Sequence, residues 1–570
     1  MRSDRIVMLM NIFLLLFLAL AGRIFYYQIL KGEKISQQAT TMRSQHIELR
    51  EYLRGDIFDR NLNPLTSSRN SWAVYLLPEA FNYRSHAYKD RPQISQEAFS
   101  KELTNLLVPV LTNKNEQEIQ AEIQTAIDGK QLVRIYSGLS SQAYERIKAS
   151  PIAGLEVAPI INRYREDGFC AHLLGYAAMG EGSKGQSGLE KVYDDILKGG
   201  ASSQQLVSVL DARGKPIQGL AFKLREEQSP NGSVITTIDK RIQEVVEKAM
   251  DQRIEKGAVV VMDIHSKEIL AMASRPTFNP YQIESIISFD ERSTLTNRAL
   301  SRFNPGSLFK ILLATAVLEE GKVSMEEQFF CSGQYVYSKN LATACWKKEG
   351  HGNLTFAQAF ANSCNPTFIQ VGMRLGRADL MQYVQKLHLT DESIIGYNPG
   401  PIGTYVKIDG GNPALGNACL GQEGVMVSPV QIASLISTVA DDGWWAQPSL
   451  VEYTIDRNGQ KQASPAGERA QVISGATVGK VKQLLEKVVL EGTGKPAAIR
   501  EARVAGKTAT SQTGRMKSAD KEILNAWFAG YFPADQPRWA VVVLAEEGSS
   551  GSENCAPVFR DISTGILQYY

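Results

Sequence analysis

The sequence predicts an α+β protein whose main domain has an antiparallel sheet with a block of helices against it. Four strand-like runs occur in two pairs, one near residue 260 and the other close to the C-terminus. These runs cover residues 258–264, 268–273, 527–532 and 539–545. Helical segments with few charges fill the interval, around residues 307–320, 355–377 and 427–441. Helices placed between an opening and a closing hairpin are typical of this arrangement.

Length and composition limit the functional classes. A chain of 570 residues has room for roughly three or four domains. Its 43% hydrophobic and 21% charged residues are typical of a folded protein. The net charge of +2 is too balanced for a nucleic-acid-binding protein, so we expect no nucleic-acid partner. Six cysteines are too dispersed for a disulfide scaffold; Cys331 and Cys345 either pair outside the cytoplasm or remain free and buried.

The N-terminus carries an apolar segment, residues 6–29, which approaches the roughly twenty residues that a membrane-spanning helix needs. Two arginines precede it, so the positive-inside rule places the rest of the chain outside the cytoplasm. Residues 19–21 (Ala-Leu-Ala) resemble a signal-peptidase site, which gives a cleaved signal as the alternative. The aromatic residues 25–27 suit a membrane interface, and we therefore favour an uncleaved single-pass anchor in residues 1–30.

Two further domains are predicted. Residues 31–230 mix charged, turn-rich stretches with helical pieces such as 95–107 and 116–127. No nucleophile, base and metal ligands gather there, so we interpret this region as a pedestal or dimerisation domain. An Asn-Gly-Ser turn marks its end, and residues 231–570 are predicted to form the catalytic domain.

The first candidate site lies in residues 304–310, where an Asn-Pro-Gly turn leads into a buried helix. Ser307 and Lys310 are three residues apart, so a helix places both side chains on one face. A lysine shielded from water can lose its proton near neutral pH and then activate the serine. Ser-x-x-Lys alone is a common pattern, and a serine cap beside a lysine that reaches solvent is the alternative interpretation.

Two more stretches supply groups that a serine nucleophile needs. Ser363 and Asn365 lie between helix-like segments, where a hydroxyl can transfer a proton and an amide can hold a substrate. Lys507, Thr508 and Thr510 follow a strand-like run, so they suit a substrate carboxylate at the edge of a sheet. Taken singly, these stretches are equally typical of a helix cap and of a solvated edge strand.

Together, the Ser-x-x-Lys, Ser-x-Asn and Lys-Thr-x stretches resemble those of the penicillin-binding proteins. Residues 54–60 (Arg-Gly-Asp-Ile-Phe-Asp-Arg) resemble the pedestal motif of the membrane-anchored class B members. Further similar stretches are residues 172–176, 188–190, 345–346, 350–352, 421–422, 428–429 and 491–494. The resemblance covers nearly the whole chain. It implies a penicillin-binding, β-lactamase-like serine acyltransferase domain and a monofunctional peptidoglycan D,D-transpeptidase.

The resemblance also implies a reaction. Ser307 would be the acylated nucleophile, Lys310 its general base and Ser363 a proton relay, while Asn365 would bind the substrate. The enzyme would attack the D-Ala-D-Ala bond of a peptidoglycan stem peptide, release D-alanine and transfer the acyl group to a neighbouring stem. β-Lactams would acylate the same serine as substrate mimics.

The third stretch would bind the end of the substrate and departs from the family pattern at one position. Lys507 and Thr508 would hold the terminal carboxylate, and the backbone amides of Ser307 and Thr510 would form the oxyanion hole. The family motif ends in glycine, whereas this chain has Ala509. Its methyl group is expected to crowd the substrate and so to affect β-lactam affinity.

Other functions remain open at this stage. A β-lactamase would use the same serine and lysine but needs a deacylating water and has no pedestal, and a β-lactam sensor would have several membrane segments. A non-catalytic scaffold of the cell-wall machinery is a third alternative. The N-terminal region is too short for the attached glycan polymerase of the bifunctional class.

We expect no cofactor and no metal, because the six histidines show no metal-binding spacing and His351 is interpreted as part of a structural turn. By resemblance, the partner would be a membrane glycan polymerase of the SEDS family, contacted by the anchor and by residues 54–60. The sequence leaves open whether the role is in elongation, division or sporulation.

Overall fold

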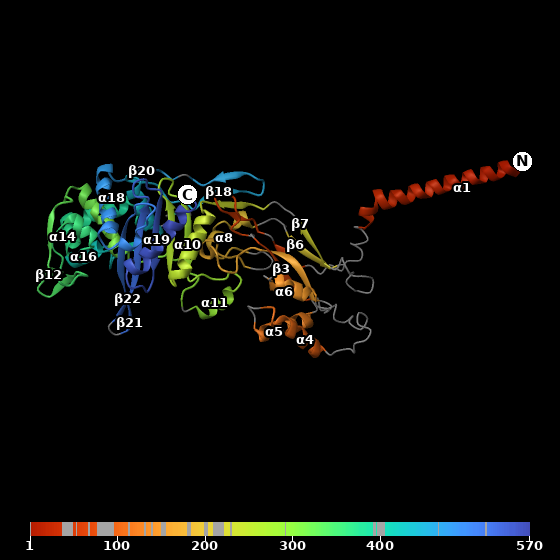
Figure 1. Ribbon diagram of the computed structural model, residues 1–570, viewed down its shortest axis with the longest axis horizontal. Coiled ribbons are helices and arrows are strands. Elements are labelled where there is room, and N and C mark those ends of the chain that lie inside the picture. Colours follow the sequence, from red (N-terminus) through yellow and green to blue (C-terminus); the bar gives the residue numbers. More distant parts are fainter. Residues whose placement is uncertain are drawn as a thin grey trace.

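A computed structural model gives the arrangement of the chain (Figure 1). It describes residues 2–36, 49–52, 54–66, 69–76, 96–111, 115–129, 133–137, 139, 141–149, 155–178, 184–198, 203–208, 222–227, 231–290, 292–391, 395, 405–465, 467–518 and 521–570. A long N-terminal helix extends from an elongated middle part, which leads into a larger body that contains the C-terminus. Residue 230, the predicted end of the pedestal, lies outside the described residues.

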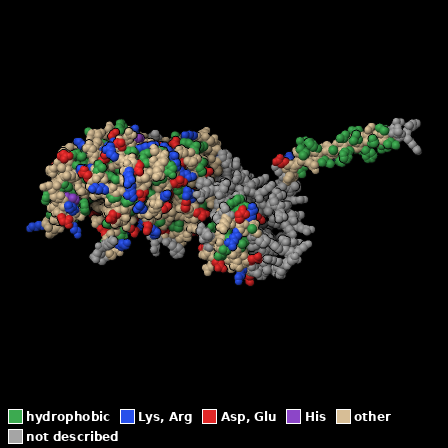
Figure 2. Space-filling model, viewed as in Figure 1, with side chains coloured by type: hydrophobic (Ala, Val, Ile, Leu, Met, Phe, Trp, Pro, Cys, Tyr) green, Lys and Arg blue, Asp and Glu red, His purple; other side chains and the backbone are tan. Residues whose placement is uncertain are grey.

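The N-terminal helix is the predicted apolar segment. Helix α1 (Arg2–Phe25) continues into the π-helical turn η1 (Tyr26–Leu30). Residues 5–30 are long and apolar enough to cross a membrane, with a mean hydropathy of 2.3, and none of their most apolar stretch is buried by the described residues. Figure 2 shows apolar side chains along this isolated helix. An apolar helix without a protein partner is the form expected of a membrane anchor.

The middle part contains two small antiparallel sheets, with strand orders β4-β3-β5 and β1-β6-β7. Their elements are β1 (Leu49–Tyr52), β3 (Arg69–Leu76), α4 (Gln96–Leu107), α5 (Glu116–Gly129), β4 (Val133–Ser137), α6 (Ser141–Lys148), β5 (Leu155–Asn162), β6 (Ser203–Ser208) and β7 (Phe222–Glu227). Helices α4 and α5 confirm the two helical pieces that the sequence predicts. Apolar residues of β3, α4 and α5, such as Val74, Leu103 and Ile123, form a separate buried cluster.

A buried ionic network surrounds Arg54, at the start of the stretch that resembles the pedestal motif. The carboxylate of Glu190 is fully buried and accepts hydrogen bonds from Arg54 Nε at 2.8 Å, Arg163 Nε at 2.5 Å and the Tyr164 hydroxyl at 2.9 Å. Arg54 also pairs with Asp194 at 2.7 Å. Three helices, α7 (Ala171–Leu174), α8 (Gly188–Val192) and α9 (Asp194–Leu197), carry or adjoin these groups. A buried carboxylate needs such compensation by opposite charge.

This network lies where the middle part joins the larger body. Strand β2 (Ile57–Phe58) pairs in parallel with β8 (Ser233–Thr236), which also pairs with β18 (Val451–Ile455). With β19 (Lys461–Ala463) they form a four-stranded sheet. A strand from early in the sequence therefore pairs with β8, about 175 residues later.

The side chains of Arg54 and Asp59 are buried in the contact between these two parts of the chain. Arg54 is 7% exposed and Asp59 is fully buried, and Asp59 accepts the backbone amide of Asn63 at 2.7 Å. Charge reversal at these positions would disturb the joint itself. It cannot report selectively on the predicted contact of residues 54–60 with a polymerase, and that contact remains a prediction.

Replacing Glu190 by glutamine should destabilise the joint. The substitution keeps the shape but leaves Arg54 and Arg163 with an uncompensated buried charge, which costs about 3–5 kcal/mol. Thermal unfolding of the full chain in detergent, with limited proteolysis to locate the opened region, measures the loss. The control is Glu244→Gln, since the Glu244 side chain is 51% exposed and lies 4.0 Å from its nearest cation. Equal unfolding temperatures for the two variants would contradict the prediction.

The larger body contains the predicted antiparallel sheet, with five strands in the order β10-β9-β23-β22-β21. The strands are β9 (Gly257–Asp263), β10 (Ile269–Arg275), β21 (Ala505–Ser518), β22 (Lys521–Phe532) and β23 (Trp539–Ala545). Both predicted hairpins are present, since β9 pairs with β10 and β22 with β23. Strand β21 lies at the edge of the sheet, and this position brings Thr510 against the turn at Gly306.

Alternation along the strands divides the core into two clusters. Val259 and Val261 face α10 (Lys240–Arg253) and α19 (Ala556–Leu567), whereas Val260 and Met262 belong to the cluster shared with the central helices. Successive strand residues point to opposite faces, so one sheet can carry helices on both sides. The result is a helix–sheet–helix body, and the predicted α+β class is confirmed.

The central helices form the block that faces the site. They are α12 (Phe309–Glu319), α13 (Phe356–Ala361), α14 (Asn365–Leu375), α15 (Arg377–Lys386), α16 (Asn412–Cys419), α17 (Pro429–Ala440) and α18 (Gly475–Leu490). Smaller elements are α11 (Ile283–Phe289), η3 (Gly306–Leu308), β11 (Gln328–Cys331), β12 (Gln334–Ser338), β13 (Leu341–Ala344), β14 (Gly352–Thr355), β15 (Tyr405–Val406), β16 (Val425–Met426), β17 (Trp444–Trp445), β20 (Ala470–Gln471), η4 (Lys495–Ala497) and η5 (Gly551–Cys555). The predicted helical stretch 355–377 is divided between α13, α14 and the start of α15, and the second candidate motif lies at the first break.

Candidate active site

The first motif lies where a tight turn enters the most buried helix of the block. Ser307 is in the 3-10 turn η3, and α12 follows directly. Residues 309–318 are all buried, as expected for an apolar helix in a large body. Ser307 itself is half-buried, so its hydroxyl lies at the border between the helical block and the exterior.

Lys310 is fully buried on the first turn of α12 and is surrounded by oxygen atoms. Its Nζ donates to Asn365 Oδ1 at 2.7 Å, to the Ser363 carbonyl at 2.9 Å and to Ser363 Oγ at 3.2 Å. Burial lowers the pKa of Lys310 to about 8, because a charged amine is poorly stabilised away from water. The amine is therefore partly neutral near physiological pH, as a general base requires.

The second motif connects Lys310 to Ser307. Ser363 Oγ donates a hydrogen bond of 2.9 Å to Ser307 Oγ and accepts one from Lys310. The backbone of Ser363 is left-handed, with a φ of 54°. A non-glycine residue in this conformation costs roughly 1–2 kcal/mol, and such strain is found most often at functional sites. The recorded link between the amine and Ser307 thus passes through the hydroxyl of Ser363.

The third motif lies on edge strand β21, against the turn that carries Ser307. Lys507 is fully buried, and both its burial and the nearby charge of Lys310 lower its pKa. Thr508 is 7% exposed, and its hydroxyl is 2.5 Å from that of Thr493. Thr510 is half-buried. The sheet edge therefore brings one lysine and two threonines beside the turn that carries Ser307.

Two glycines permit the close approach of these elements. Gly306 has a φ of 55°, and a Cβ there would lie 3.0 Å from the Thr510 carbonyl oxygen. Gly421 has a φ of 66°, and a Cβ there would lie 2.2 Å from the Gly306 carbonyl oxygen. The amide of Gly306 donates to the Gly421 carbonyl at 2.9 Å. The turn that carries Ser307 is thereby held between β21 and the segment that follows α16.

Ala509 is buried rather than exposed to the site. Ala509 is 3% exposed and belongs to the core cluster that also contains Leu308 and Trp527. The methyl group therefore packs on the strand face that also carries Lys507, in the cluster next to the turn of Ser307. Because neighbouring side chains already cover this methyl group, we predict little effect on acylation, in place of the crowding expected from the sequence.

Replacing Ala509 by glycine should cost stability and leave acylation nearly unchanged. Loss of one buried methyl group costs about 0.8 kcal/mol, and glycine in a strand adds roughly 0.5–1 kcal/mol. We expect a lower unfolding temperature with a β-lactam acylation rate within about threefold of the parent. Stopped-flow acylation with a chromogenic β-lactam measures the rate. An increase beyond tenfold would show that the methyl group does obstruct the site.

The structure brings all the predicted site residues into one region, and it adds groups that the sequence did not single out. Thr493 was noted only as part of a similar stretch, yet it contacts Thr508. Cys331, Cys345, His351 and Cys364 come together beside the second motif, although the spacing of the histidines had suggested no metal site. All six cysteines are buried free thiols among the described residues, so the pairing of Cys331 with Cys345 considered above does not occur.

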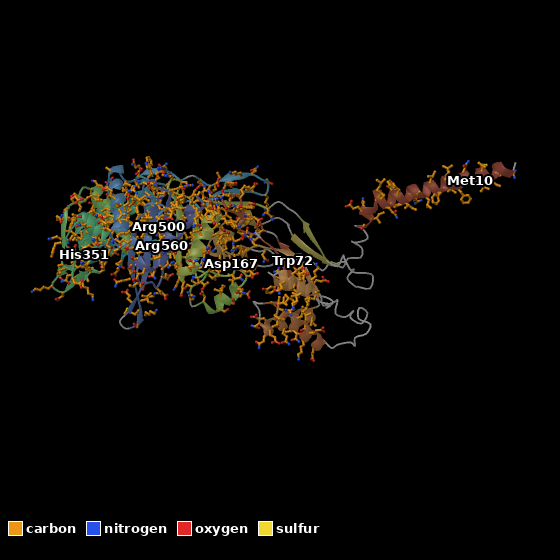
Figure 3. The ribbon with its side chains drawn as sticks, in the orientation of Figure 1. Met10, Trp72, Asp167, His351, Arg500 and Arg560 are labelled. Atoms are coloured by element: carbon orange, nitrogen blue, oxygen red, sulfur yellow. The ribbon has the colours of Figure 1, made fainter. Side chains whose placement is uncertain are left out.

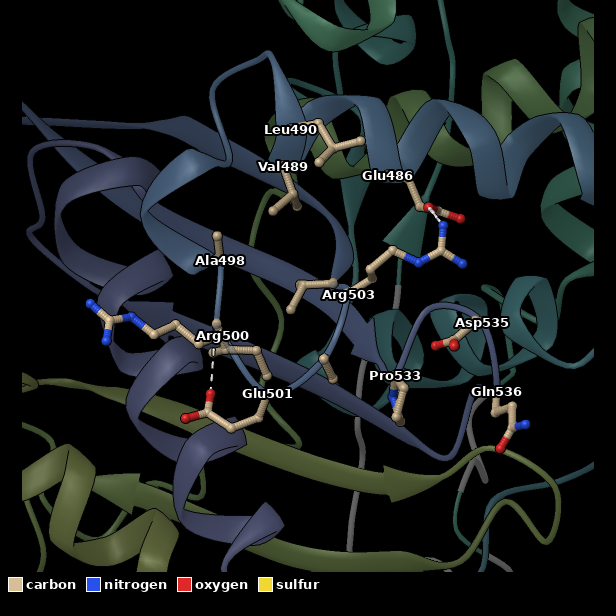
Figure 4. A pocket seen from close by; sticks show the side chains of 13 residues that line it. Glu486, Val489, Leu490, Ala498, Arg500, Glu501, Arg503, Pro533, Asp535 and Gln536 are labelled. Carbon is tan, nitrogen blue, oxygen red and sulfur yellow. Dashed lines mark hydrogen bonds and ion pairs between the residues drawn. The ribbon is translucent and has the colours of Figure 1, made fainter.

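A surface cavity of about 600 Å³ lies elsewhere in the catalytic body (Figure 4). Its walls come from α18, the residues after η4 and the turn between β22 and β23. The ion pair of Arg503 with Glu486, at 3.2 Å, spans one side. None of the candidate catalytic residues lines it, so this cavity is separate from the site.

The geometry supplies the parts of a serine acyl-transfer site: a hydroxyl nucleophile, a buried amine, a bridging hydroxyl and a cation at a sheet edge. The family model for the penicillin-binding protein transpeptidase domain matches residues 257–564, which is more than half of the chain. The chain belongs to the penicillin-binding protein transpeptidase family. Residues 51–237 match the penicillin-binding protein dimerisation domain.

Relatives align along nearly the full length. Stage V sporulation protein D of Bacillus subtilis (strain 168) is 29% identical over 97% of this chain and 84% of its own. Peptidoglycan D,D-transpeptidase FtsI of Escherichia coli (strain K12) is 25% identical over 99% of this chain and 92% of its own. The crystal structure of the D,D-transpeptidase domain of a peptidoglycan glycosyltransferase from Eggerthella lenta is 26% identical, with a TM-score of 0.58 over 73% of this chain and 93% of that one. These matches confirm the predicted class B family and its fold.

Proposed function

We propose that this protein is a peptidoglycan D,D-transpeptidase that acts through an acyl-enzyme on Ser307. The observation that carries the proposal is the continuous hydrogen-bonded connection from Ser307 through Ser363 to the buried amine of Lys310. This connection supports the proposal because an amine of lowered pKa, suited to act as a base, lies one hydroxyl away from Ser307.

In the acylation step, Ser307 Oγ forms a bond to the carbonyl carbon of the D-Ala-D-Ala linkage, and its proton passes through Ser363 to neutral Lys310. The C–N bond to the terminal D-alanine then breaks, and the leaving amine takes a proton back along the same path. In the second step, the amine of a neighbouring stem attacks the ester carbonyl. Its proton is returned to Ser307 as the ester bond breaks, so the enzyme emerges unchanged.

Substrate binding is assigned to the remaining predicted residues. Lys507 and Thr508 would hold the terminal carboxylate, whose negative charge would compensate the buried cation. Asn365 would bind the substrate through a hydrogen bond to its amide. The backbone amides of Ser307 and Thr510 would stabilise the oxyanion. β-Lactams would enter the same site and acylate Ser307.

Product analysis tests this proposal. A synthetic stem pentapeptide is incubated with the full-length protein and a labelled D-amino acid as acceptor, and D-alanine release and exchange product are followed by mass spectrometry. Release together with an exchanged product is expected. Release without exchange would indicate a hydrolase, and neither product would indicate a scaffold.

Membrane anchoring is supported by α1 and by the class of relatives, and we further propose that the catalytic body lies outside the cytoplasm. Alkaline phosphatase fused to the C-terminus should be active, because that enzyme requires an oxidising compartment. A fluorescent protein that matures only in the cytoplasm should remain dark at the same position. The opposite pair of results would reverse the orientation.

We also propose a division into anchor (1–30), pedestal (31–230) and transpeptidase domain (231–570), with a SEDS-family glycan polymerase as partner of α1. Because Arg54 and Asp59 are buried, the informative change is exchange of α1 for an unrelated membrane helix of equal length. Co-purification with the polymerase should fall while β-lactam acylation is retained. Undiminished co-purification would place the contact outside the anchor.

A further inference from the structure

Three thiols and one imidazole come together behind the second motif. Cys331 ends β11, Cys345 follows β13, His351 precedes β14 and Cys364 caps α14. One ligand atom from each of these residues lies within 4.8 Å of all the others. The three cysteines are between 0% and 3% exposed, and His351 is half-buried. Figure 3 places His351 at the end of the catalytic body farthest from the anchor.

The distances fit a tetrahedral zinc ion. With Zn–S bonds of about 2.3 Å and Zn–N bonds of 2.0–2.1 Å, tetrahedral angles place a sulfur and a nitrogen about 3.6 Å apart. His351 Nδ1 lies 3.6 Å from Cys331 Sγ and 3.6 Å from Cys345 Sγ. A disulfide would need two sulfurs at about 2.05 Å, and all these cysteines are free thiols.

The surroundings suit thiolate ligands. The backbone amides of Lys347 and Asn365 donate to the sulfur of Cys345, and Thr367 Oγ1 donates to that of Cys364 at 3.3 Å. The His351 ring makes an edge contact with Trp346, with ring centroids 5.3 Å apart. Such outer contacts fix the orientation of ligands and stabilise negative sulfur.

The loops that present the ligands approach one another closely. The amide of Cys345 donates to the Gly333 carbonyl at 2.8 Å. A Cβ at Gly350 would lie 2.3 Å from the Cys331 carbonyl oxygen, and the φ of Gly350 is 81°. The backbone is therefore arranged so that residues from four separate positions converge.

We propose that Cys331, Cys345, His351 and Cys364 bind one zinc ion in a closed structural site. Soft thiolate ligands with one imidazole favour zinc over magnesium or calcium, and four protein ligands leave no open position for catalysis.

The zinc site would position the catalytic loop. Cys364 lies between Ser363 and Asn365, both of which contact Lys310. A metal bond to Cys364 would restrain the neighbouring Ser363, whose backbone is left-handed. This consequence for activity rests on the proposed transpeptidase function, whereas zinc binding does not.

Metal content tests the proposal directly. The full-length protein is purified in detergent with thiols protected, equilibrated with Zn²⁺, freed of loose metal and measured by mass spectrometry for zinc per chain. About one zinc is expected, as for a four-ligand structural site. Cys331→Ser and His351→Ala should lose it, whereas Cys419→Ser, a buried cysteine on α16 outside the cluster, should retain it. Tetrahedral cobalt–thiolate absorption after Co²⁺ exchange provides a second signature.

Because ligand variants can misfold, chelation of the parent protein gives an independent reading. Removal of zinc should lower the unfolding temperature and slow β-lactam acylation, and added Zn²⁺ should restore both. Ser307→Ala should keep its zinc, so a failure of the transpeptidase proposal would leave the metal result unaffected. Less than about 0.1 zinc per chain after equilibration, zinc retained by both ligand variants, or a disulfide within the cluster would overturn the proposal.

Discussion

Ser307→Ala should reduce D-alanine release from a stem peptide by a factor on the order of 10⁴ or more, because the variant has no atom that can form the acyl bond. The backbone of the turn and the buried residues around it are unchanged by the substitution, so substrate binding should be retained. The measurement is the initial rate of D-alanine release beside a binding measurement with the same peptide.

The control for this variant is Ser301→Ala, a half-buried serine on the same approach to the turn whose hydroxyl donates to the Asn297 carbonyl. Its rate should stay within about threefold of the parent. If Ser307→Ala retained more than about a tenth of the activity, the nucleophile would have to be another residue and the proposed mechanism would be wrong.

Lys310→Met should lower the acylation rate by roughly 10²–10⁴-fold, the usual contribution of a general base. Methionine fills a similar volume in the buried position and donates no hydrogen bonds. In the parent protein, the acylation rate should rise as pH increases and level off above about 8, the pKa of Lys310, because only the neutral amine can take the serine proton. The measurement is β-lactam acylation between pH 6 and 9.5.

The pH profile of Lys310→Met separates a base from a structural residue. A base predicts that the rise near pH 8 disappears with the substitution. A profile that keeps its shape at a lower rate would assign the titration to another group and leave Lys310 a packing role.

The sheet and its flanking helices could be predicted because the pattern of apolar residues is local. Short, nearly continuous apolar runs at residues 258–264 and 539–545 identify buried strands, and Asp239 caps α10 as its position before a helix with a regular apolar face indicates. The antiparallel order of the strands could not be predicted in full. The edge position of β21 depends on contacts between segments more than 200 residues apart.

The site residues were predicted from side chains whose chemistry fits a serine nucleophile. The hydrogen bonds that connect these side chains were not predicted. Helical spacing suggested direct contact of Lys310 with Ser307, whereas the observed link passes through Ser363. That link depends on the left-handed backbone of Ser363, which no local pattern signals. The burial of the Ala509 methyl group likewise depends on tertiary packing against β21, which the local sequence does not show.

The cysteine cluster shows a similar limit. Its four residues are separated by 13, 5 and 12 intervening positions, a spacing unlike the short repeats that identify zinc sites in sequences. Convergence arises because β11 pairs with β14 and the loop before α14 closes over them. Tertiary contacts, rather than sequence spacing, assemble this set of ligands.

The most direct test of the central claim is intact-mass analysis of the full-length protein after incubation with a penicillin, followed over hours, with peptide mapping of the adduct. We predict one adduct per chain, located on Ser307, persistent over this period and absent from Ser307→Ala. An adduct on another residue, or one that vanishes within seconds as the drug is consumed, would contradict a slowly deacylating transpeptidase that uses Ser307.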